Sequence, residues 1–165
     1  MDYPKTKYGV GIGLFRGKSV YLSQRMWNQL HYSNVWQIVY GSVKSDYERY
    51  ADAAVRVVKE PTGLNIDVSR FCYIKSILVG LNEFYYIYFV HLKDDEQIRP
   101  VTMEELAIRS NLVPVPLDEA VLRTLVPGLE KILRRALISL RKSETVKVIE
   151  KAIPPDDSVY SCLYD

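Results

Sequence analysis

Short stretches of apolar or alternating residues divide the chain into predicted strands. The clearest of them cover residues 8–15, 19–25, 35–39, 68–79 and 84–92. Arg16-Gly17-Lys18, between the first two, is typical of a turn and predicts a hairpin. Residues 112–117 contain two prolines, which lack the N–H that a central strand donates, so we expect an edge or extended segment there.

A period near 3.6 residues predicts helices elsewhere. Over residues 45–60, apolar side chains share one side of a helix and charged side chains share the other. Ser45 and Glu48 have capping-box spacing, and Pro61 should end this helix near Glu60. Residues 129–142 form a second amphipathic pattern. We also expect a helix over 118–125 capped by Asp118, one or two helical turns over 103–109, and a further turn or helix over 144–152.

The order of these elements is strands, one helix, strands, then helices. It predicts a single α/β (α+β) domain over residues 1–165, with helices on both sides of a mixed sheet. We place the core at about residues 7–125, a C-terminal helical extension at about 126–153, and a short, loosely held tail at 154–165.

Glycine occupies every second position of the first predicted strand, at Gly9, Gly11 and Gly13. Alternation places all three on one face, where the missing side chains favour close approach by another backbone or a helix. The spacing is not that of a dinucleotide-binding fingerprint.

Composition adds bounds on the class of protein. The 165 residues are 48% hydrophobic and 25% charged, an ordinary globular balance, and the net charge of +2 is too small to argue for nucleic acid by itself. Cys72 and Cys162 lie far apart, and we expect free thiols, which fit a reducing compartment. No secretory signal and no apolar run of about 18 residues is visible, so we expect a soluble, cytoplasmic protein without a membrane span.

Residues 41–64 resemble the signature of the Nudix hydrolases, G-x5-E-x7-R-E-U-x-E-E-x-G-U, where U is a bulky aliphatic residue. Aligned on the helix, the chain has Glu48, seven further residues, Arg56, and later Glu60, Gly63 and Leu64. Upstream, residues 22–25 resemble the family's second strand, and residues 36–41 stand where the family often has W-x-x-P-G-G. Downstream, residues 113–120 resemble its W-V-P-L-D-E-A segment. The resemblance implies a Nudix-like fold, a mixed sheet sandwiched between helices.

The chain departs from the family signature at positions that carry chemistry. Gly41 lies seven positions before Glu48, where the family glycine lies six before, and Val57 and Pro61 replace two glutamates. Family members hold Mg²⁺ or Mn²⁺ through clustered carboxylates on this helix, and the metals polarise a diphosphate linkage and activate water. Of these positions on the helix, only Glu60 keeps a carboxylate, so the resemblance is to a degenerate box.

If the chain is active, the resemblance implies catalytic roles for Glu60, Arg56 and Glu48, with Mg²⁺ or Mn²⁺ on Glu60. Asp52 is a candidate substitute metal ligand on the helix, and residues 94–96 or 104–105 are candidates in loops. The alternative is structural. Glu48, Asp52, Arg56 and Glu60 follow at i, i+4, which is typical of a solvated, salt-bridged face, and capping alone explains Glu48.

Candidate substrate-binding residues are Arg25, Tyr40, Gly41, Tyr86 and Tyr88. Tyr40 replaces a family glycine at the mouth of the expected site, and Tyr86 and Tyr88 share one strand face that suits base stacking. The alternative for the tyrosines is ordinary strand packing. The last helix carries a basic set that suits phosphates or an acidic partner, or a solvated face: Lys131, Arg134, Arg135, Arg141 and Lys142.

Three functions remain open on the sequence. The leading hypothesis is a Nudix-like module that has lost the ordinary metal site and binds a nucleotide, RNA or a protein without efficient hydrolysis. The second is a diverged Mg²⁺- or Mn²⁺-dependent hydrolase of a nucleoside diphosphate derivative. The third is a structural subunit that docks to a protein partner through its C-terminal helix.

Overall fold

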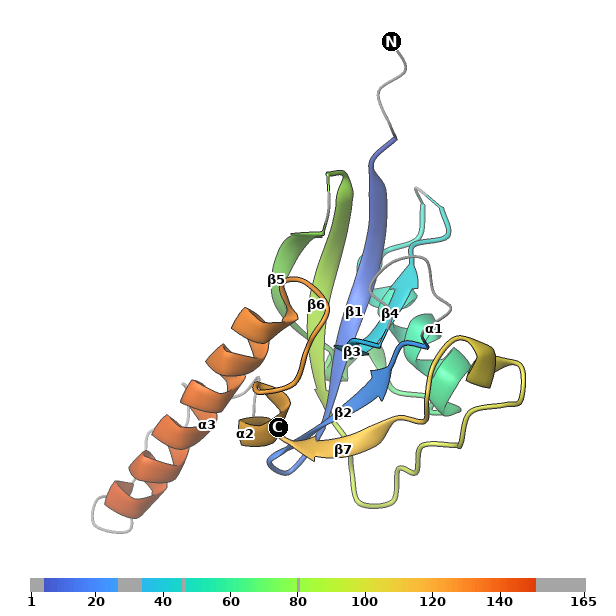
Figure 1. Cartoon of the computed structure of the whole chain (residues 1–165). Coiled ribbons are helices and arrows are strands. Elements are labelled where there is room, and N and C mark those ends of the chain that lie inside the picture. Colours follow the sequence, from blue (N-terminus) through green and yellow to red (C-terminus); the bar gives the residue numbers. More distant parts are fainter. Residues whose placement is uncertain (1–4, 27–33, 46, 80, 151–165) are drawn as a thin grey trace.

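The computed structural model describes residues 5–26, 34–45, 47–79 and 81–150, with side chains described up to residue 142. In this part of the chain, a seven-stranded mixed sheet lies between helices (Figure 1). The strands are β1 (Lys7–Arg16), β2 (Ser19–Gln24), β3 (Trp36–Gln37), β4 (Val39–Ser42), β5 (Cys72–Val79), β6 (Glu83–His91) and β7 (Val113–Pro116). The helices are α1 (Tyr50–Thr62), α2 (Leu117–Ala120) and α3 (Leu129–Glu150), with single 3-10 turns at Val68–Arg70 and Glu105–Ala107.

Strand β1 organises the sheet, whose order is β3-β2-β1-β6-β5. One edge of β1 pairs in parallel with β6 from Lys7 to Phe15. The other edge is shared, because Phe15 and Arg16 pair with β2 while Gly9 to Ile12 pair with β4. Strands β2 and β4 therefore diverge from one another at β1, and β7 pairs with the first four residues of β2, Ser19 to Leu22.

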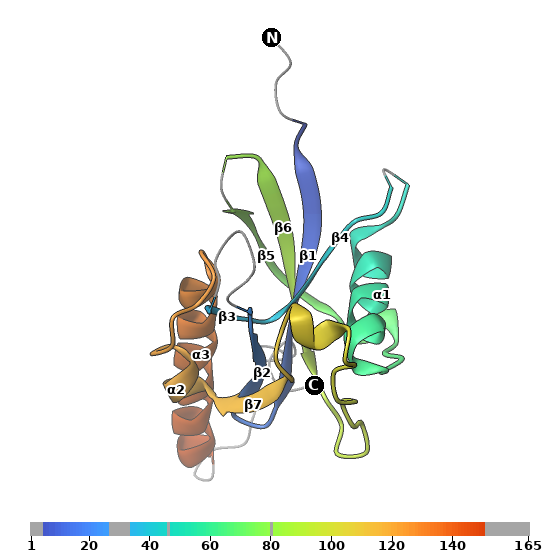
Figure 2. The ribbon, with the colours of Figure 1, turned by 45° about the vertical axis from the view of Figure 1, so that its right-hand side comes forward.

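Helices cover both faces of the sheet, which confirms the expected architecture (Figure 2). On one face, α1 buries Ala53, Ala54, Val57 and Val58 against apolar residues of β1, β4 and β6. On the other face, α2 and α3 close a second core cluster with β2, β6 and β7. The apolar side of α3, from Leu129 to Ala136, belongs to this cluster, so the start of the C-terminal helix is packed against the sheet.

The start of α1 differs from the predicted capping box. The helix begins at Tyr50, its N-cap Arg49 makes no side-chain cap, and residues up to 49 precede it as a loop. The Glu48 carboxylate does not reach back to the Ser45 N–H. It accepts hydrogen bonds from the Lys44 N–H and from Arg56 instead. The Arg56 guanidinium, nearly two turns inside the helix, is the stronger partner for a carboxylate, and it holds Glu48 in the loop.

The end of α1 lies two residues beyond the predicted stop. Pro61 is accommodated in the last turn, and the helix ends at Thr62. Gly63 follows in the left-handed conformation with φ 73° and donates its N–H to the Lys59 carbonyl, as the sequence predicted for a glycine exit.

Other boundaries differ more modestly. The apolar stretch 35–39 becomes two short strands, β3 and β4, and the strand predicted from residue 68 begins at Cys72, after a 3-10 turn capped by Asp67. The helix predicted over 118–125 is only one turn long, with Pro116 instead of Asp118 at its N-cap. Helix α3 runs without a break to Glu150, through most of the segment predicted as a separate turn or helix. The tail from residue 151 lies outside the described residues.

The glycine stripe of β1 is covered mainly by aromatic rings, not by the second backbone or helix expected from the sequence. A Cβ at Gly11 would lie 2.6 Å from the Tyr40 ring and 2.7 Å from Ile87. A Cβ at Gly9 would lie 2.5 Å from the Tyr85 ring and 2.9 Å from the Gly41 carbonyl. The absence of side chains on β1 is therefore what lets large side chains of β4 and β6 lie across the sheet.

The prediction of a free thiol is wrong for Cys72, whose sulfur is in a disulfide. The other cysteine of the sequence, Cys162, lies outside the described residues. Cysteine usage therefore gives no support to a reducing compartment. Within the described residues, no helix is both long and apolar enough to cross a membrane.

Candidate functional site

A cleft of about 410 Å³ opens between the end of α1 and strands β2 to β4. Its polar wall comes from three cationic side chains and two carboxylates, and its apolar floor comes from β4 and α1. The cleft is lined by Ser23, Gln37, Ile38, Val39, Tyr40, Gly41, Ser42, Lys44, Arg56, Val57, Glu60, Pro61, Glu105, Arg109 and Leu112. The divergence of β2 from β4 leaves room for it at the edge of β1.

The helix positions that resemble metal-ligand positions all line this cleft, but their chemistry has changed. Val57 is 3% exposed and packs on Gly41, where a Cβ would lie 2.5 Å from its Cγ2 atom. Pro61 supplies no donor atom from its side chain. Among the described residues, no group of three or more His, Cys, Asp or Glu side chains is arranged to hold a metal ion. The residues present therefore do not fit the cluster of oxygen ligands that Mg²⁺ or Mn²⁺ requires.

Glu48 folds back onto α1 and forms a two-pronged ion pair with Arg56. The Arg56 Nε and Nη2 atoms donate to its two carboxylate oxygens over 2.8 and 3.0 Å. Arg56 also donates to the Ser42 carbonyl over 2.8 Å, so the pair fixes the loop between β4 and α1. These bonds, helped by the Lys44 N–H, lower the pKa of Glu48 to about 2.

Two cationic side chains lie beside Glu60, the retained carboxylate, which is 59% exposed. The Lys44 ammonium lies 3.7 Å from its Oε1 atom, and the Arg56 Nη1 atom lies 3.5 Å from the same oxygen. In a metal site, such a carboxylate binds a divalent ion together with further carboxylates. Here an ammonium and a guanidinium lie beside Glu60 instead, so the cleft places positive charge next to this carboxylate.

The segment after β6 forms the opposite wall of the cleft and is tied together by Glu105. Arg99 donates to this carboxylate over 2.6 Å, and Arg109 donates to it over 3.0 Å. Arg99 also donates to the Glu60 carbonyl, which fastens the segment to the end of α1. The bonds from Arg99, and then from Thr102, lower the pKa of Glu105 below its usual value, so this carboxylate is anionic and already paired.

A second cavity of about 540 Å³ lies beside the cleft and shares Gln37 and Tyr40 with it. Its other lining residues come from the end of β5, the β5–β6 turn, β6, the residue after β2 and the segment before α3: Val79, Leu81, Asn82, Glu83, Tyr85, Arg25, Val126 and Pro127. The rings of Tyr40 and Tyr85 meet edge to face, with centroids 5.2 Å apart. This cavity is therefore aromatic and apolar, with a few polar groups at its wall.

Two polar groups of the second cavity lack hydrogen-bond partners among the described residues. The Tyr40 hydroxyl and the Arg25 Nε atom are buried without a hydrogen-bond partner. Arg25 donates from Nη1 to Gln37 over 3.3 Å, and no described carboxylate forms an ion pair with it. Burial, together with the nearby Tyr85, raises the pKa of Tyr40 well above its usual value, so the hydroxyl stays a donor. Unpartnered buried donors of this kind are suited to a ligand that brings acceptors.

The structure brings some of the sequence candidates together and separates others. Arg56, Glu60, Tyr40 and Gly41 line the cleft, Glu48 reaches it through Arg56, and Arg25 meets Tyr40 in the second cavity. Asp52 is exposed and lines a groove on the outer side of α1. Tyr86 and Tyr88 line neither the cleft nor the second cavity and lie in an aromatic cluster on the α1 face of β6.

Sequence reasoning missed Lys44, Arg109 and Gln37. Lys44 lies in the loop between the first glycine and first glutamate of the box, so its closeness to the expected site was a usable signal. Gln37 and Arg109 gave no comparable signal. Arg109 enters the cleft only because its backbone forms a bridge with Arg25, far away in the sequence.

Comparisons with known proteins agree with this fold. The NUDIX domain model matches residues 5–136. No curated protein matches the chain at a significant level. A mutT/nudix family protein from Listeria innocua is 14% identical, with a TM-score of 0.65 over 87% of this chain and 99% of that chain. A C. elegans Ap4A hydrolase is 16% identical, with a TM-score of 0.62 over 82% and 98%.

The NUDIX domain of Shewanella oneidensis NrtR, solved in complex with ADP ribose, is also similar. It is 15% identical, with a TM-score of 0.63 over 84% of this chain and 90% of that chain. At these identities the solved structures support the fold alone. The family model, however, spans most of the chain, and the chain therefore belongs to the NUDIX domain family.

Proposed function

We propose that this NUDIX domain binds a nucleoside diphosphate derivative as a free anion, without a divalent metal and without efficient hydrolysis. The observation that carries the proposal is the pairing of Glu60 with the Lys44 ammonium and the Arg56 guanidinium. A diphosphate needs positive charge around its oxygens, which a metal supplies in a hydrolase. In this cleft, Lys44 and Arg109 supply it from the protein.

Lys44 is the cation best placed to exchange its partner. Its side chain is 67% exposed, and its distance of 3.7 Å from Glu60 is long for a hydrogen bond. A phosphate oxygen therefore displaces only a weak contact when it binds Lys44. Arg56 and Arg109 are held by Glu48 and Glu105 and serve as a fixed positive frame.

The nucleoside part of the ligand fits the second cavity. Tyr40 and Tyr85 offer ring faces and edges to a base, and Arg25 and the Tyr40 hydroxyl offer hydrogen-bond donors. Because Gln37 and Tyr40 line both spaces, a ligand that spans them passes beside these two residues. ADP ribose, the ligand solved with the NrtR NUDIX domain, combines a base and a diphosphate and is the first probe to use.

The alternative is a diverged hydrolase that uses Glu60 and Glu105 for Mg²⁺ or Mn²⁺, since both carboxylates line the cleft. It requires Glu105 to release Arg99 and Arg109, which donate to it over 2.6 and 3.0 Å, and this costs more than displacing the weak contact between Lys44 and Glu60. The structural-subunit alternative stays a prediction. The apolar side of α3 packs on the sheet, which leaves a basic outer side for a protein partner.

Titration calorimetry tests the proposal. ADP ribose and a nucleoside diphosphate are titrated into the protein in EDTA and again in Mg²⁺. We expect the same affinity, or a weaker one in Mg²⁺, because the metal neutralises the ligand. Lys44→Ala should weaken binding by about tenfold, the loss of one charge-assisted contact.

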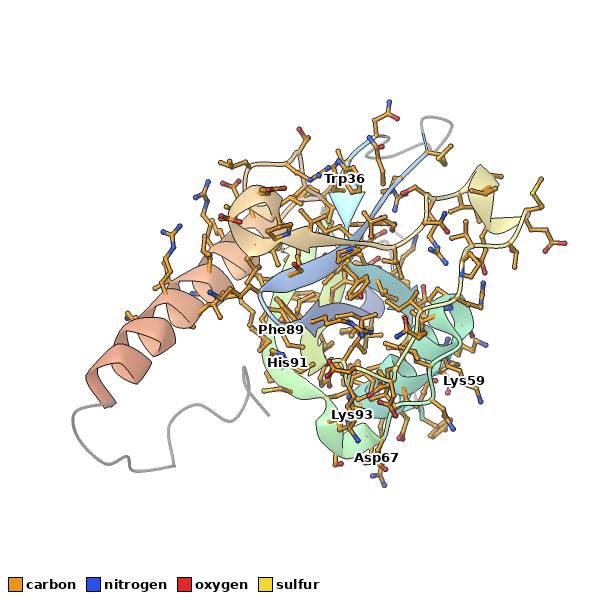
Figure 3. The ribbon with its side chains drawn as sticks, turned by 90° about the horizontal axis from the view of Figure 1, so that it is seen from below. Trp36, Lys59, Asp67, Phe89, His91 and Lys93 are labelled. Carbon is orange, nitrogen blue, oxygen red and sulfur yellow. The ribbon has the colours of Figure 1, made fainter. Side chains whose placement is uncertain are left out.

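Lys59→Ala is the matched control, because Lys59 is a lysine of α1 that lines the outer groove and neither the cleft nor the second cavity. Figure 3 shows Lys59 on the outer side of α1, far from Trp36, the residue before the cleft residue Gln37. Binding that appears only in Mg²⁺ or Mn²⁺ overturns the proposal. Equal losses of affinity in the Lys44→Ala and Lys59→Ala variants would also overturn the proposal, because the loss would then come from the net charge of the protein and not from a contact with Lys44.

A further inference from the structure

The second cavity holds one cationic and one anionic side chain that do not pair with each other. Arg25 and Glu83 both line it. Among the described residues, the Arg25 guanidinium makes a single side-chain hydrogen bond, to Gln37 over 3.3 Å, and Glu83 has only a 3.7 Å contact with Lys7. Opposite charges attract strongly in a partly buried space. Two that share a cavity without meeting are suited to a ligand that lies between them and satisfies both.

Strand order brings these two side chains to the cavity from opposite sides of β1. Glu83 begins β6, which pairs with one edge of β1, and Arg25 follows β2, which pairs with the other edge. Strands two places apart in a sheet are separated by roughly 10 Å. Burial raises the pKa of the Tyr85 hydroxyl above its usual value, Glu83 adds to this rise and Arg25 opposes it, so both charges act on this one ring of the cavity.

Two aromatic rings form a floor on which a flat group can stack. The rings of Tyr40 and Tyr85 line the cavity and meet edge to face, with centroids 5.2 Å apart. They lie close to β1 because the positions beneath them are glycines. A Cβ at Gly11 would lie 2.6 Å from the Tyr40 ring, and one at Gly9 would lie 2.5 Å from the Tyr85 ring. A floor of this kind, in a cavity of about 540 Å³, suits a planar heterocycle.

The charged groups beside this floor match one nucleic-acid base better than the others. Guanine has two neighbouring acceptors, N7 and O6, to which an arginine donates two hydrogen bonds. Its N1–H and 2-amino groups, on the next edge, are donors that a carboxylate accepts.

The other bases match these charges less well. Adenine has an amino donor in place of O6 and an acceptor in place of N1–H, so it would present a donor to Arg25 and an acceptor to Glu83. Cytosine has the same mismatch. Uracil turns its O2 acceptor toward the carboxylate, where guanine has its amino group.

We propose that the second cavity is a guanine site, in which Arg25 donates to N7 and O6 and Glu83 accepts from N1–H and the 2-amino group. The Tyr40 hydroxyl, which is buried without a hydrogen-bond partner among the described residues, is a further donor for the base. The inference rests on the proposed function, because the cavity joins the cleft at Gln37 and Tyr40. It narrows the preferred ligand to a guanosine diphosphate derivative, with adenine compounds such as ADP ribose as weaker ligands.

Titration calorimetry in EDTA with GDP, inosine diphosphate, ADP and UDP tests the base preference separately from diphosphate binding. We expect GDP to bind at least about tenfold more tightly than ADP or UDP. Inosine diphosphate, which lacks the 2-amino group, should bind with an intermediate affinity. Lys44→Ala should weaken all four by a similar factor and leave their ratios unchanged, because Lys44 lines the cleft and not the second cavity.

Glu83→Gln should change the preference for the base without abolishing binding. A glutamine amide donates to the O2 of xanthine, at the position where the carboxylate accepts from the amino group of guanine. We therefore expect Glu83→Gln to weaken GDP binding about tenfold, to strengthen xanthosine diphosphate binding, and to leave ADP within about twofold. A misfolded variant could not gain affinity for a new base. Lys7→Gln is the matched control, because it removes the 3.7 Å contact with Glu83 but keeps the carboxylate.

The outcomes separate this inference from the proposed function. Equal affinities for all four nucleotides in EDTA would overturn the guanine site and leave diphosphate binding intact. No binding of any nucleotide in EDTA would overturn both. A preference for GDP that persists in Glu83→Gln would show that Glu83 does not contact the base, and would overturn the assignment. Equal loss of the preference in Lys7→Gln and Glu83→Gln would also overturn it, because the ion contact and not the free carboxylate would then be responsible.

Discussion

Replacing Glu48 by Gln tests whether the loop before α1 is held by the Glu48–Arg56 ion pair. The pair has two hydrogen bonds, 2.8 and 3.0 Å long, and side chains that are only 18% and 23% exposed. The pKa of Glu48 is about 2 in the folded protein and 4.5 in an ordinary environment. That difference corresponds to roughly 3 kcal/mol of stability as an upper bound, and hydrogen bonds to charged groups contribute about 1.5–3 kcal/mol.

The sign of the pH dependence follows from the lowered pKa. Stability from Glu48 is fully present above about pH 4.5 and is lost as the pH falls toward 2, because the unfolded chain takes up the proton first. We therefore expect Glu48→Gln to lower the free energy of unfolding by about 2–3 kcal/mol at pH 7. The difference from the unmodified protein should shrink as the pH approaches 3.

Urea denaturation at pH 7, 4 and 3 measures both quantities. Glu130→Gln is the control, since Glu130 and Arg134 also form a 2.8 Å pair but are 57% and 51% exposed. An exposed pair of that kind should contribute about 0.5 kcal/mol or less. A loss below about 1 kcal/mol for Glu48→Gln, or a loss that is the same at pH 3 as at pH 7, would refute the reasoning.

Three further substitutions probe the packing around the cleft. Val57→Glu should destabilise the protein by about 2 kcal/mol or more in thermal melts, because Val57 is buried on Gly41; an unchanged melt contradicts this. Gly11→Ala should cost about 1–3 kcal/mol, since its Cβ meets the Tyr40 ring, and a neutral result would disprove the contact. Tyr40→Phe should keep or raise stability, yet weaken ADP ribose binding in calorimetry; unchanged affinity would exclude the hydroxyl as a ligand donor.

The architecture was predictable because the side of each strand or helix that faces the core shows in the local spacing of its apolar residues. Alternating apolar stretches gave strands β1, β2, β5 and β6, and the 3.6-residue period gave α1 and α3. The predicted start of α1 was wrong because a local cap and a longer-range ion pair compete for the Glu48 carboxylate. Ser45 and Glu48 have capping spacing, but the Arg56 guanidinium provides two charged hydrogen bonds where the cap offers one neutral bond.

The candidate site was only partly predictable, because some of its residues are brought together by contacts between distant parts of the chain. The spacing of the family signature identified Arg56 and Glu60, and it showed that Val57 and Pro61 replace two glutamates of the family. The position of Lys44 inside the box loop indicated that it lies near the site, but not that its ammonium lies 3.7 Å from Glu60. Arg109 reaches the cleft through strand pairing, which one sequence does not specify.

Hydrolysis of a broad panel of nucleotides tests the central claim most directly. The panel includes nucleoside triphosphates, dinucleoside polyphosphates, nucleotide sugars, ADP ribose and capped RNA, with Mg²⁺ and with Mn²⁺, beside a Glu60→Gln variant. The cations beside Glu60, together with Val57 and Pro61 in place of oxygen ligands, predict no turnover above that of the variant on any substrate. Turnover that requires metal and disappears in Glu60→Gln would contradict the account and would show that the cleft assembles a metal site.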